Sequence, residues 1–249
     1  MRKFRLMTMC IVLILCATMA IGGIYAYLTA RDASVNKVTI GDVHISAWEP
    51  NWPTEDKDGD GIPDESELLV PYDEVSKDPR IRNTGTNDCI VFFRITSPVE
   101  ELTVIDDDGT RHAAADVDLF YFKQAEDSAD EHANHWDENW VELTELDGKF
   151  VTCNGANEEN KGYTYIFGYH VRLAAGETTS NLFDKIQNKK YGSRTISANE
   201  AETIRIEACA IQADEIYQNG KTMDTSGELT EDQLTCIYRV FFNQNADQL

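Results

Sequence analysis

Acidic residues are concentrated in one short stretch, residues 56–67, which reads DKDGDGIPDESE. Aspartate occupies its first, third, fifth and ninth positions, glycine the sixth and glutamate the last. This is the spacing of a calcium loop, in which alternate side chains converge on one centre, glycine makes the sharp turn and the final glutamate offers both carboxylate oxygens. The predicted Ca²⁺ ligands are Asp56, Asp58, Asp60, the main-chain carbonyl of Ile62, Asp64 and Glu67. The alternative, a solvated acidic loop, leaves the placement of the glycine and the last glutamate unexplained.

The residues before this loop differ from those of an EF-hand. The segment EPNWPTE carries two prolines, which exclude an entering helix. The motif therefore resembles a lone extracellular calcium loop, a class with dissociation constants of about 10⁻⁴ to 10⁻³ M. At ~0.1 mM affinity and ~1 mM calcium, binding would contribute about 1.4 kcal/mol to stability. We expect a structural ion that braces an insertion at residues 50–70.

A second group of metal-ligating residue types lies in the stretch EHANHWDE, residues 131–138. His132 and His135 are three residues apart, with Glu131, Asp137 and Glu138 nearby, and on a helix this spacing would let both histidines share a metal with a carboxylate. A polar loop that contains two histidines is the favoured interpretation. The motifs H-E-x-x-H and G-x-S-x-G are absent from the sequence, as is a phosphate-binding glycine loop. The sequence thus predicts no catalytic residue, no organic cofactor and no enzyme.

Net charge limits the partners of the chain. The 249 residues include 22 Lys and Arg against 44 Asp and Glu, a formal charge of −22. Such a protein repels phosphate, so nucleic acid and anionic membrane surfaces are excluded as partners. A hydrophobic content of 42% is sufficient for a folded core.

The first residues have the pattern of an export signal. Residues 1–5 form a basic segment, and residues 6–28 are uncharged and mostly apolar; the small-residue stretch AIGGIYA lies near the end of this run, at 20–26. We expect a signal peptidase to remove residues 1–26, which leaves a secreted domain of residues 27–249. The alternative is a retained anchor, because the apolar run is long enough to span a bilayer; only through this segment would the protein contact a membrane.

Cysteine usage is compatible with export. Cys10 and Cys16 belong to the signal segment, so the mature chain has four cysteines, for which three pairings exist: Cys89, Cys153, Cys209 and Cys236. Cys89 shares an alternating apolar face with Val91, and buried free thiols are the alternative to disulfides.

Hydrophobic periodicity predicts a mainly β protein. Alternating or continuous apolar runs indicate strands at residues 37–48, 88–96, 101–106, 162–173 and 202–212. Without regular strand and helix alternation, they favour an antiparallel β-sandwich. The stretch DDDGT at 106–110 fits a hairpin turn. The least periodic and most acidic segment, about 107–160, is expected to form excursions outside the sandwich, although its Trp136 and Trp140 require burial.

One helix is clearly indicated near the C-terminus. Thr230 and Gln233 form a capping box. The apolar residues that follow repeat at helical spacing and form one stripe, made of Leu234, Ile237, Tyr238 and Phe241.

Four segments together resemble the TasA/camelysin family of exported bacterial proteins. They are, in chain order, GGIYAYLTARDASVNKVTIGDVHISAWEP, SKDPRIRNTGTNDCIVFFRI, YTYIFGYHVRLAAGETTSNLFDKI and IRIEACAIQAD. The resemblance implies a jelly-roll-like β-sandwich, export through a dedicated signal peptidase of Gram-positive bacteria, and a role at the cell surface or in the biofilm matrix, often in fibres. The calcium loop at 50–70 and the acidic segment at 107–160 depart from the family pattern.

These observations lead to one expected function and two alternatives. We expect a structural protein of the cell surface or biofilm matrix that self-assembles or binds other matrix proteins, with the apolar segment 27–40 adding to the sheet edge of a neighbour. A strand that stays within its own monomer is the simpler alternative for that segment. The other function classes are a camelysin-like surface metallo-endopeptidase and a monomeric calcium-dependent adhesin with an exposed Trp136 or Trp140.

Overall fold

The computed structural model describes residues 42–67, 69–106, 108–146, 148–152, 161–190, 203–218 and 220–244. The chain divides into two units, Met1–Asp42 and Val43–Leu249. The signal segment expected at residues 1–26 lies outside the described residues. No helix in the described part is long and apolar enough to cross a membrane.

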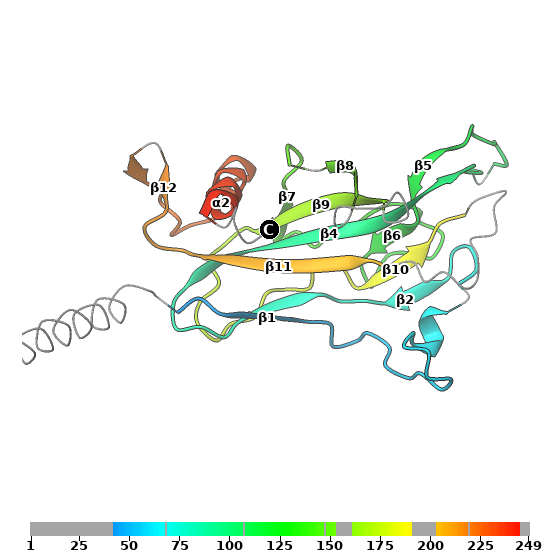
Figure 1. Ribbon diagram of the computed structural model, residues 1–249, viewed down its shortest axis with the longest axis horizontal. Coiled ribbons are helices and arrows are strands. Elements are labelled where there is room, and N and C mark those ends of the chain that lie inside the picture. Colours follow the sequence, from blue (N-terminus) through cyan, green and yellow to red (C-terminus); the bar gives the residue numbers. More distant parts are fainter. Residues whose placement is uncertain are drawn as a thin grey trace, which may run out of the picture. The chain divides into compact units, whose positions relative to one another are not determined.

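The larger of the sheets has four strands in a continuous antiparallel order and two more at its margins (Figure 1). The order is β11 (Arg205–Gln212), β4 (Cys89–Leu102), β9 (Lys161–Tyr169) and β7 (Trp140–Glu142), with β5 (Ala115–Asp118) on β4 and β8 (Gly148–Thr152) on β9.

Shorter antiparallel strands form the second layer of the sandwich. They are β2 (Glu74–Ser76), β10 (Lys185–Asn188) and β6 (Phe120–Lys123) in one sheet, and β1 (Ile45–Trp48) with β3 (Arg80–Asn83) in another. The main core lies between the layers, where Phe93 and Phe167 of the larger sheet meet Phe122 and Ile186 of the smaller one. A separate hairpin is formed by β12 (Tyr217–Gln218) and β13 (Lys221–Thr222).

Strand β4 is apolar on both faces because both faces are covered. Its inward residues Cys89, Val91 and Phe93 belong to the main core, whereas Ile90 and Phe92 belong to a second apolar cluster on the outer face. A continuous apolar run is the pattern of a strand that is buried on two sides.

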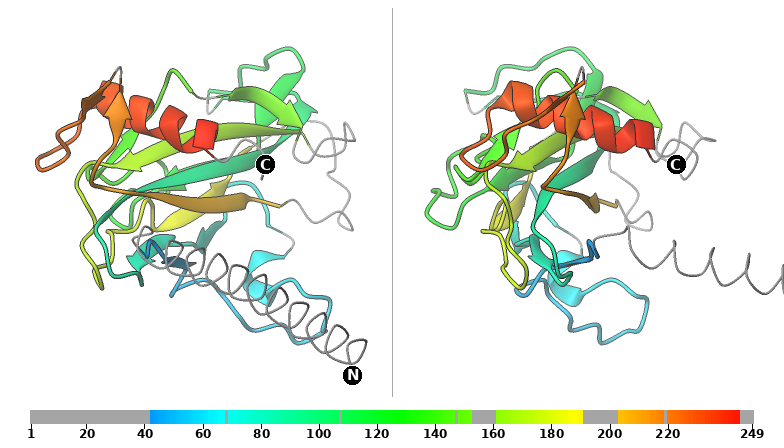
Figure 2. Two further views of the ribbon diagram at one scale, coloured as in Figure 1. Left: turned by 60° about the vertical axis from the view of Figure 1, so that its left-hand side comes forward. Right: turned by 90° about the vertical axis from the view of Figure 1, so that its left-hand side faces the viewer.

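The outer face is covered by α2 (Glu231–Gln244), which lies across the larger sheet in Figure 2. Leu234 and Ile237 are fully buried against that sheet. The predicted capping box is confirmed, since Thr230 N–H donates to Gln233 Oε1 at 3.0 Å and Gln233 N–H donates to Thr230 Oγ1 at 3.3 Å. Gly168 allows the close approach, because a Cβ there would lie 2.9 Å from Leu234 Cδ2.

The fold class expected from the sequence, a mainly β antiparallel sandwich with a C-terminal helix, is confirmed. The predicted strands 88–96 and 101–106 differ in extent, because one strand, β4, runs through Pro98 to Leu102. On one edge of β4, pairing with β11 ends at Thr96 and pairing with β5 begins at Val99, so the missing N–H of Pro98 falls where that edge is interrupted, while pairing with β9 continues on the other edge. The turn at 106–110 is confirmed by a backbone hydrogen bond from Asp106 N–H to the Thr110 carbonyl at 2.9 Å.

The acidic segment 107–160 is more integrated than expected. It supplies β5, β6, β7 and β8, and its Phe122 and Trp140 are part of the main core. Trp140 is only 5% exposed, and Trp136 is partly buried against Phe122 and Phe167. The burial that these tryptophans require is therefore provided by the sandwich itself, and the exposed tryptophan that an adhesin was expected to use is not found at either position.

Candidate metal sites

The acidic loop 50–70 is attached at its N-terminal end to the connection between β2 and β3. The main-chain and side-chain amides of Asn51 donate to the buried Asp78 carboxylate at 2.8 and 2.9 Å. Next to them, the Lys77 ammonium lies 4.3 Å from the ring centroid of Trp52 and pairs with Glu49 at 2.8 Å. These contacts fix where the loop leaves the fold.

The C-terminal end of the loop is attached to β10. The Asn188 side-chain amide donates to the Leu69 carbonyl at 3.1 Å, and the Tyr72 N–H donates to the Asn188 carbonyl at 2.8 Å. Leu69 also packs against the main core. Both ends of the loop are thus held, and residues 56–61 between them are exposed to solvent.

Within the loop, aspartate side chains bind main-chain amides and impose the turn. Asp56 accepts hydrogen bonds from Gly59 N–H at 2.7 Å and Gly61 N–H at 3.0 Å, and Asp60 accepts one from Ile62 N–H at 2.8 Å. Gly61 has φ of +91°, a value that favours glycine, at the position where the motif requires it. One carboxylate oxygen from each of three residues lies within 4.8 Å of the other two: Asp56, Asp58 and Asp60.

One residue of the loop interacts with a predicted ligand in a way that the motif did not indicate. The Lys57 ammonium pairs with Asp64 at 2.8 Å, and its main-chain N–H donates to the same carboxylate at 3.0 Å. These hydrogen bonds lower the pKa of Asp64. A bound cation would have to displace the Lys57 ammonium from that carboxylate. Because Lys57 occupies a position that the motif leaves unspecified, spacing alone gave no signal for this competition.

Glu67, the predicted last ligand, provides the most specific feature of the loop. Its Oε1 atom is buried and accepts no hydrogen bond from the described residues. Burial raises the pKa of this carboxyl, and the nearby charges of Asp58, Asp60, Asp64 and Asp56 raise it further. A buried carboxylate oxygen without a donor is unfavourable unless a cation or proton satisfies it. The predicted ligand atoms around Glu67 are all oxygens. Ca²⁺ prefers oxygen ligands, so these residues fit that ion.

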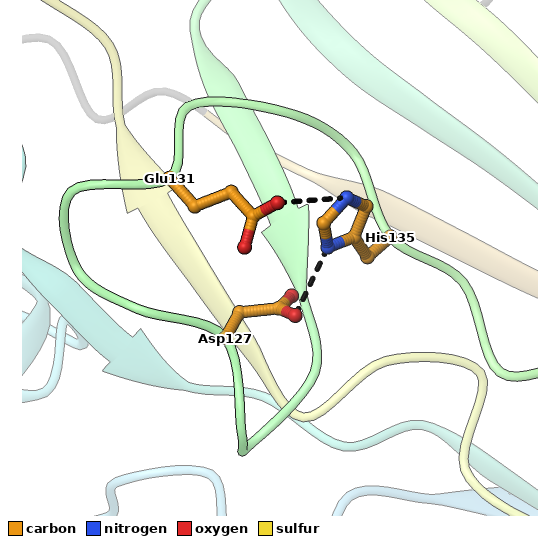
Figure 3. Close-up of side chains that lie close together, drawn as sticks. All are labelled: Asp127, Glu131 and His135. Atoms are coloured by element: carbon orange, nitrogen blue, oxygen red, sulfur yellow. Dashed lines mark ion pairs between the residues drawn. The ribbon is translucent and has the colours of Figure 1, made fainter.

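A second cluster lies in the loop between β6 and β7 (Figure 3). His135 Nδ1 lies 2.9 Å from Asp127 Oδ1, and His135 Nε2 lies 3.5 Å from Glu131 Oε1. His132, the other histidine of the sequence motif, is not part of this cluster; its ring stacks on Tyr72 with a centroid distance of 4.0 Å. The structure therefore does not bring the two histidines of the sequence motif together. It groups one histidine with two carboxylates, and these residues lie on a loop and not on a helix.

The arrangement around His135 is that of a charged imidazole. Each ring nitrogen faces a carboxylate, and only the protonated ring has a hydrogen to donate on both sides. The hydrogen bond to Asp127 raises the pKa of His135. Burial opposes ionisation of Asp127, but the hydrogen bonds from His135 and from the Gln124 N–H outweigh it and lower its pKa. These ion pairs hold the two ends of the loop together, and a metal would have to replace a proton on the ring.

The surroundings of Cys89 and Cys209 disfavour a reactive thiolate. Cys89 faces the main core, whereas Cys209 packs into the cluster under α2 on the opposite face of the sheet, so the two cannot bond to each other. Both are free thiols. Burial raises the pKa of Cys89 to about 11 and that of Cys209 to about 12, which disfavours the nucleophilic thiolate. Cys236 lies on α2, and Cys153 is outside the described residues.

The chain was compared with family models, with curated proteins and with solved structures. None of the three comparisons gives a match. The likeness to the TasA/camelysin family rests on the four segments quoted above, and it remains a prediction.

Proposed function

We propose that the protein is an exported structural protein of the bacterial cell surface or biofilm matrix, of the TasA/camelysin type, and that a calcium ion braces its loop 50–70. The observation that carries the calcium assignment is the buried Glu67 Oε1, which accepts no hydrogen bond within the described chain and lies near the charges of four aspartates of the motif. Export would require a signal peptidase acting near residue 26.

The attachment of the loop supports a structural role for the ion. The hydrogen bonds of Asn51 and Asn188 hold the two ends of the loop to the sandwich, so the ion would stiffen a loop that is already anchored at both ends. At ~1 mM calcium and ~0.1 mM affinity the effect is about 1.4 kcal/mol, enough to stabilise the loop and too little to fold the domain.

Strand β1 supports the proposal of self-assembly. Among the described strands it pairs only with β3, so its other edge presents main-chain groups that an added strand can bind. Ser46, Ala47 and Trp48 are exposed, and Trp48 is 38% exposed although it is a large apolar side chain. The charge of −22 opposes close packing of subunits, and bound calcium would reduce that repulsion.

Negative-stain microscopy of the purified full-length protein, with calcium and with chelator, tests the assembly proposal. We expect fibres with calcium and fewer or none with chelator. The Glu67→Gln variant should resemble the chelated protein, and Glu65→Gln, which changes an exposed neighbour outside the ligand positions, should resemble the wild type. Discrete monomers under both conditions would refute self-assembly and leave the calcium brace to be judged by thermal unfolding.

A further inference from the structure

One ion pair joins the last residue of β5 to the residue that follows β10. Lys189 Nζ is in direct contact with Asp118 Oδ1, although the two residues lie 71 positions apart in the chain. Their side chains are only 15% and 14% exposed. The Lys189 main-chain N–H also donates to the Leu119 carbonyl at 2.9 Å, so the backbone holds the two segments together. The contact thus places an amine nitrogen beside a carboxyl group, the two reactants of an amide bond.

The other oxygen of Asp118 is held by a tyrosine of β9. The Tyr165 hydroxyl donates to Asp118 Oδ2 at 2.9 Å, and the Asn134 side-chain amide donates to the Tyr165 oxygen at 3.3 Å. Burial and the Asp118 charge raise the pKa of Tyr165, so its hydroxyl keeps the proton that it donates. A fixed donor at a carboxyl oxygen stabilises the negative charge that develops there when a nucleophile adds to the carboxyl carbon.

Aromatic rings keep the pair largely out of water. Lys189 Nζ lies 4.4 Å from the ring centroid of Tyr121, and the rings of Tyr163 and Tyr165 lie 4.5 Å apart between centroids. Removal of water weakens the solvation of both charges of an ion pair. The cost of moving a proton from the ammonium to the carboxylate therefore falls, and this transfer produces the neutral amine that can act as a nucleophile.

We propose that Lys189 and Asp118 become joined by an isopeptide bond, an amide between their side chains, once the chain has folded. A proton passes from Nζ to Oδ1 within the contact, and the amine adds to Cγ while the Tyr165 hydroxyl stabilises the charge on Oδ2. The Cγ–Oδ1 bond then breaks. Oδ1 leaves as water with two of the three ammonium protons, and the third proton stays on the amide nitrogen.

The step consumes no oxidant, metal or cofactor. Condensation of an amine with a carboxylic acid is unfavourable between separate molecules in water, but well-oriented groups of one molecule reach effective molarities of about 10⁵–10⁸ M. The bond would link β5, which pairs with β4 of the larger sheet, to the end of β10 in the second layer. It depends neither on calcium in the loop 50–70 nor on self-assembly.

Mass spectrometry of the purified full-length protein, denatured before measurement, tests the proposal. The intact mass should be lower than the calculated mass by one water molecule. Trypsin should fail to cleave after Lys189 and should release a branched fragment that joins this lysine to the peptide containing Asp118. A wild-type protein at its full calculated mass contains only an ion pair, and this result would refute the bond.

Variants separate this bond from other losses of water. Lys189→Arg and Asp118→Ala should each have the full calculated mass, whereas Lys190→Arg, which changes the neighbouring ammonium, should still lack one water. Tyr165→Phe should leave most chains at full mass, and complete condensation in that variant would overturn the role of the hydroxyl. A loss of water that persists in Lys189→Arg, or that maps to an aspartate–glycine sequence such as 108–109, would identify a cyclic imide instead and refute the proposal.

Discussion

At the scale of single residues, Glu67 combines two properties that a calcium ligand would explain. One of its carboxylate oxygens is buried without a hydrogen-bond donor in the described chain, and four aspartates raise its pKa in addition to burial. Both are unfavourable for an empty loop, and both are relieved by a cation at the centre of the motif.

Substitution of Glu67 by glutamine should therefore remove the response to calcium. We expect calcium to raise the melting temperature of the wild type by about 3 to 6 °C, and to leave that of Glu67→Gln unchanged. Without calcium the variant should melt no lower than the wild type, because it lacks one of the repelling charges. Scanning calorimetry with chelator and with ~1 mM calcium gives both values.

Glu65→Gln is the matched control for this measurement. Glu65 is exposed and lies between the ligand positions of Asp64 and Glu67. A calcium response that survives in Glu67→Gln and is lost in Glu65→Gln would contradict the ligand assignment.

The sequence predicted those features of the candidate calcium loop that depend only on residues close together in the chain. The positions of Asp56, Asp60 and Gly61 follow from spacing, and the structure gives them the matching turn. The ion pair of Lys57 with Asp64 was not predictable, because it depends on where a long flexible side chain points. The stacking of Tyr72 on His132 was not predictable either, since it joins segments that are distant in sequence.

At the scale of elements, the contact between α2 and β9 depends on the absence of a side chain at Gly168. A Cβ there would lie 2.9 Å from Leu234 Cδ2 and 3.0 Å from Phe92 Cε1. Gly168→Ala should therefore force the helix outward and destabilise the protein by about 1 to 3 kcal/mol, as measured by urea unfolding.

Gly227→Ala provides the comparison for that variant. A Cβ at Gly227 meets no atom within 4 Å, and its backbone has no positive φ, so its effect should stay within about 0.5 kcal/mol. Equal effects of the two substitutions would show that backbone entropy, and not the helix contact, controls the result.

The loop between β6 and β7 should be sensitive to pH. Because the pKa of His135 is raised above 6.5, its ion pairs stabilise the fold below that pH and are lost as pH rises through the folded value. Because the pKa of Asp127 is lowered below 3.8, its contribution is present above that pH and is lost as pH falls through the folded value. The ion pairs should therefore hold the loop most firmly at pH values above the folded-state pKa of Asp127 and below that of His135.

An NMR titration of the His135 ring tests this arrangement. The wild-type pKa should lie above 6.5, and Asp127→Asn should lower it because the partner charge is gone. Asp130→Asn, which removes an exposed carboxylate of the same loop outside the His135 cluster, should change it much less. A His135 pKa at or below 6.5 in the wild type would contradict the ion pairs of His135 with Asp127 and Glu131.

Helices and strands were predictable where the hydrophobic pattern is strong and shows clearly which residues are buried. The capping box of Thr230 and the stripe on α2 gave the helix correctly, and the run around Phe93 gave β4. The prediction that segment 107–160 forms excursions outside the sandwich is wrong, because the acidity of the segment hides its short strands. Phe122 and Trp140 enter the core from strands of four and three residues, too short to show a period.

At the scale of the whole molecule, the net charge of −22 should make stability depend on salt. Acidic side chains repel one another across the surface, and screening acts over about 10 Å at 0.1 M ionic strength. The melting temperature of the chelated protein should therefore rise when NaCl increases from ~10 to ~150 mM. A fall over this range, measured in the same buffer by circular dichroism, would mean that favourable ion pairs such as those of Glu74 outweigh the repulsion.

The position of α2 has a consequence for how the chain is made. The face that it covers, with Ile90, Phe92 and Ile166, belongs to β4 and β9, which leave the ribosome well before residues 231–244. About 130 residues separate the end of β4 from the start of α2, so at ~5–20 residues per second β4 lacks its helix for about 6 to 26 seconds. During that interval the apolar face of β4 and β9 is exposed to solvent. A chaperone that holds the emerging chain would bind this face until α2 docks on it.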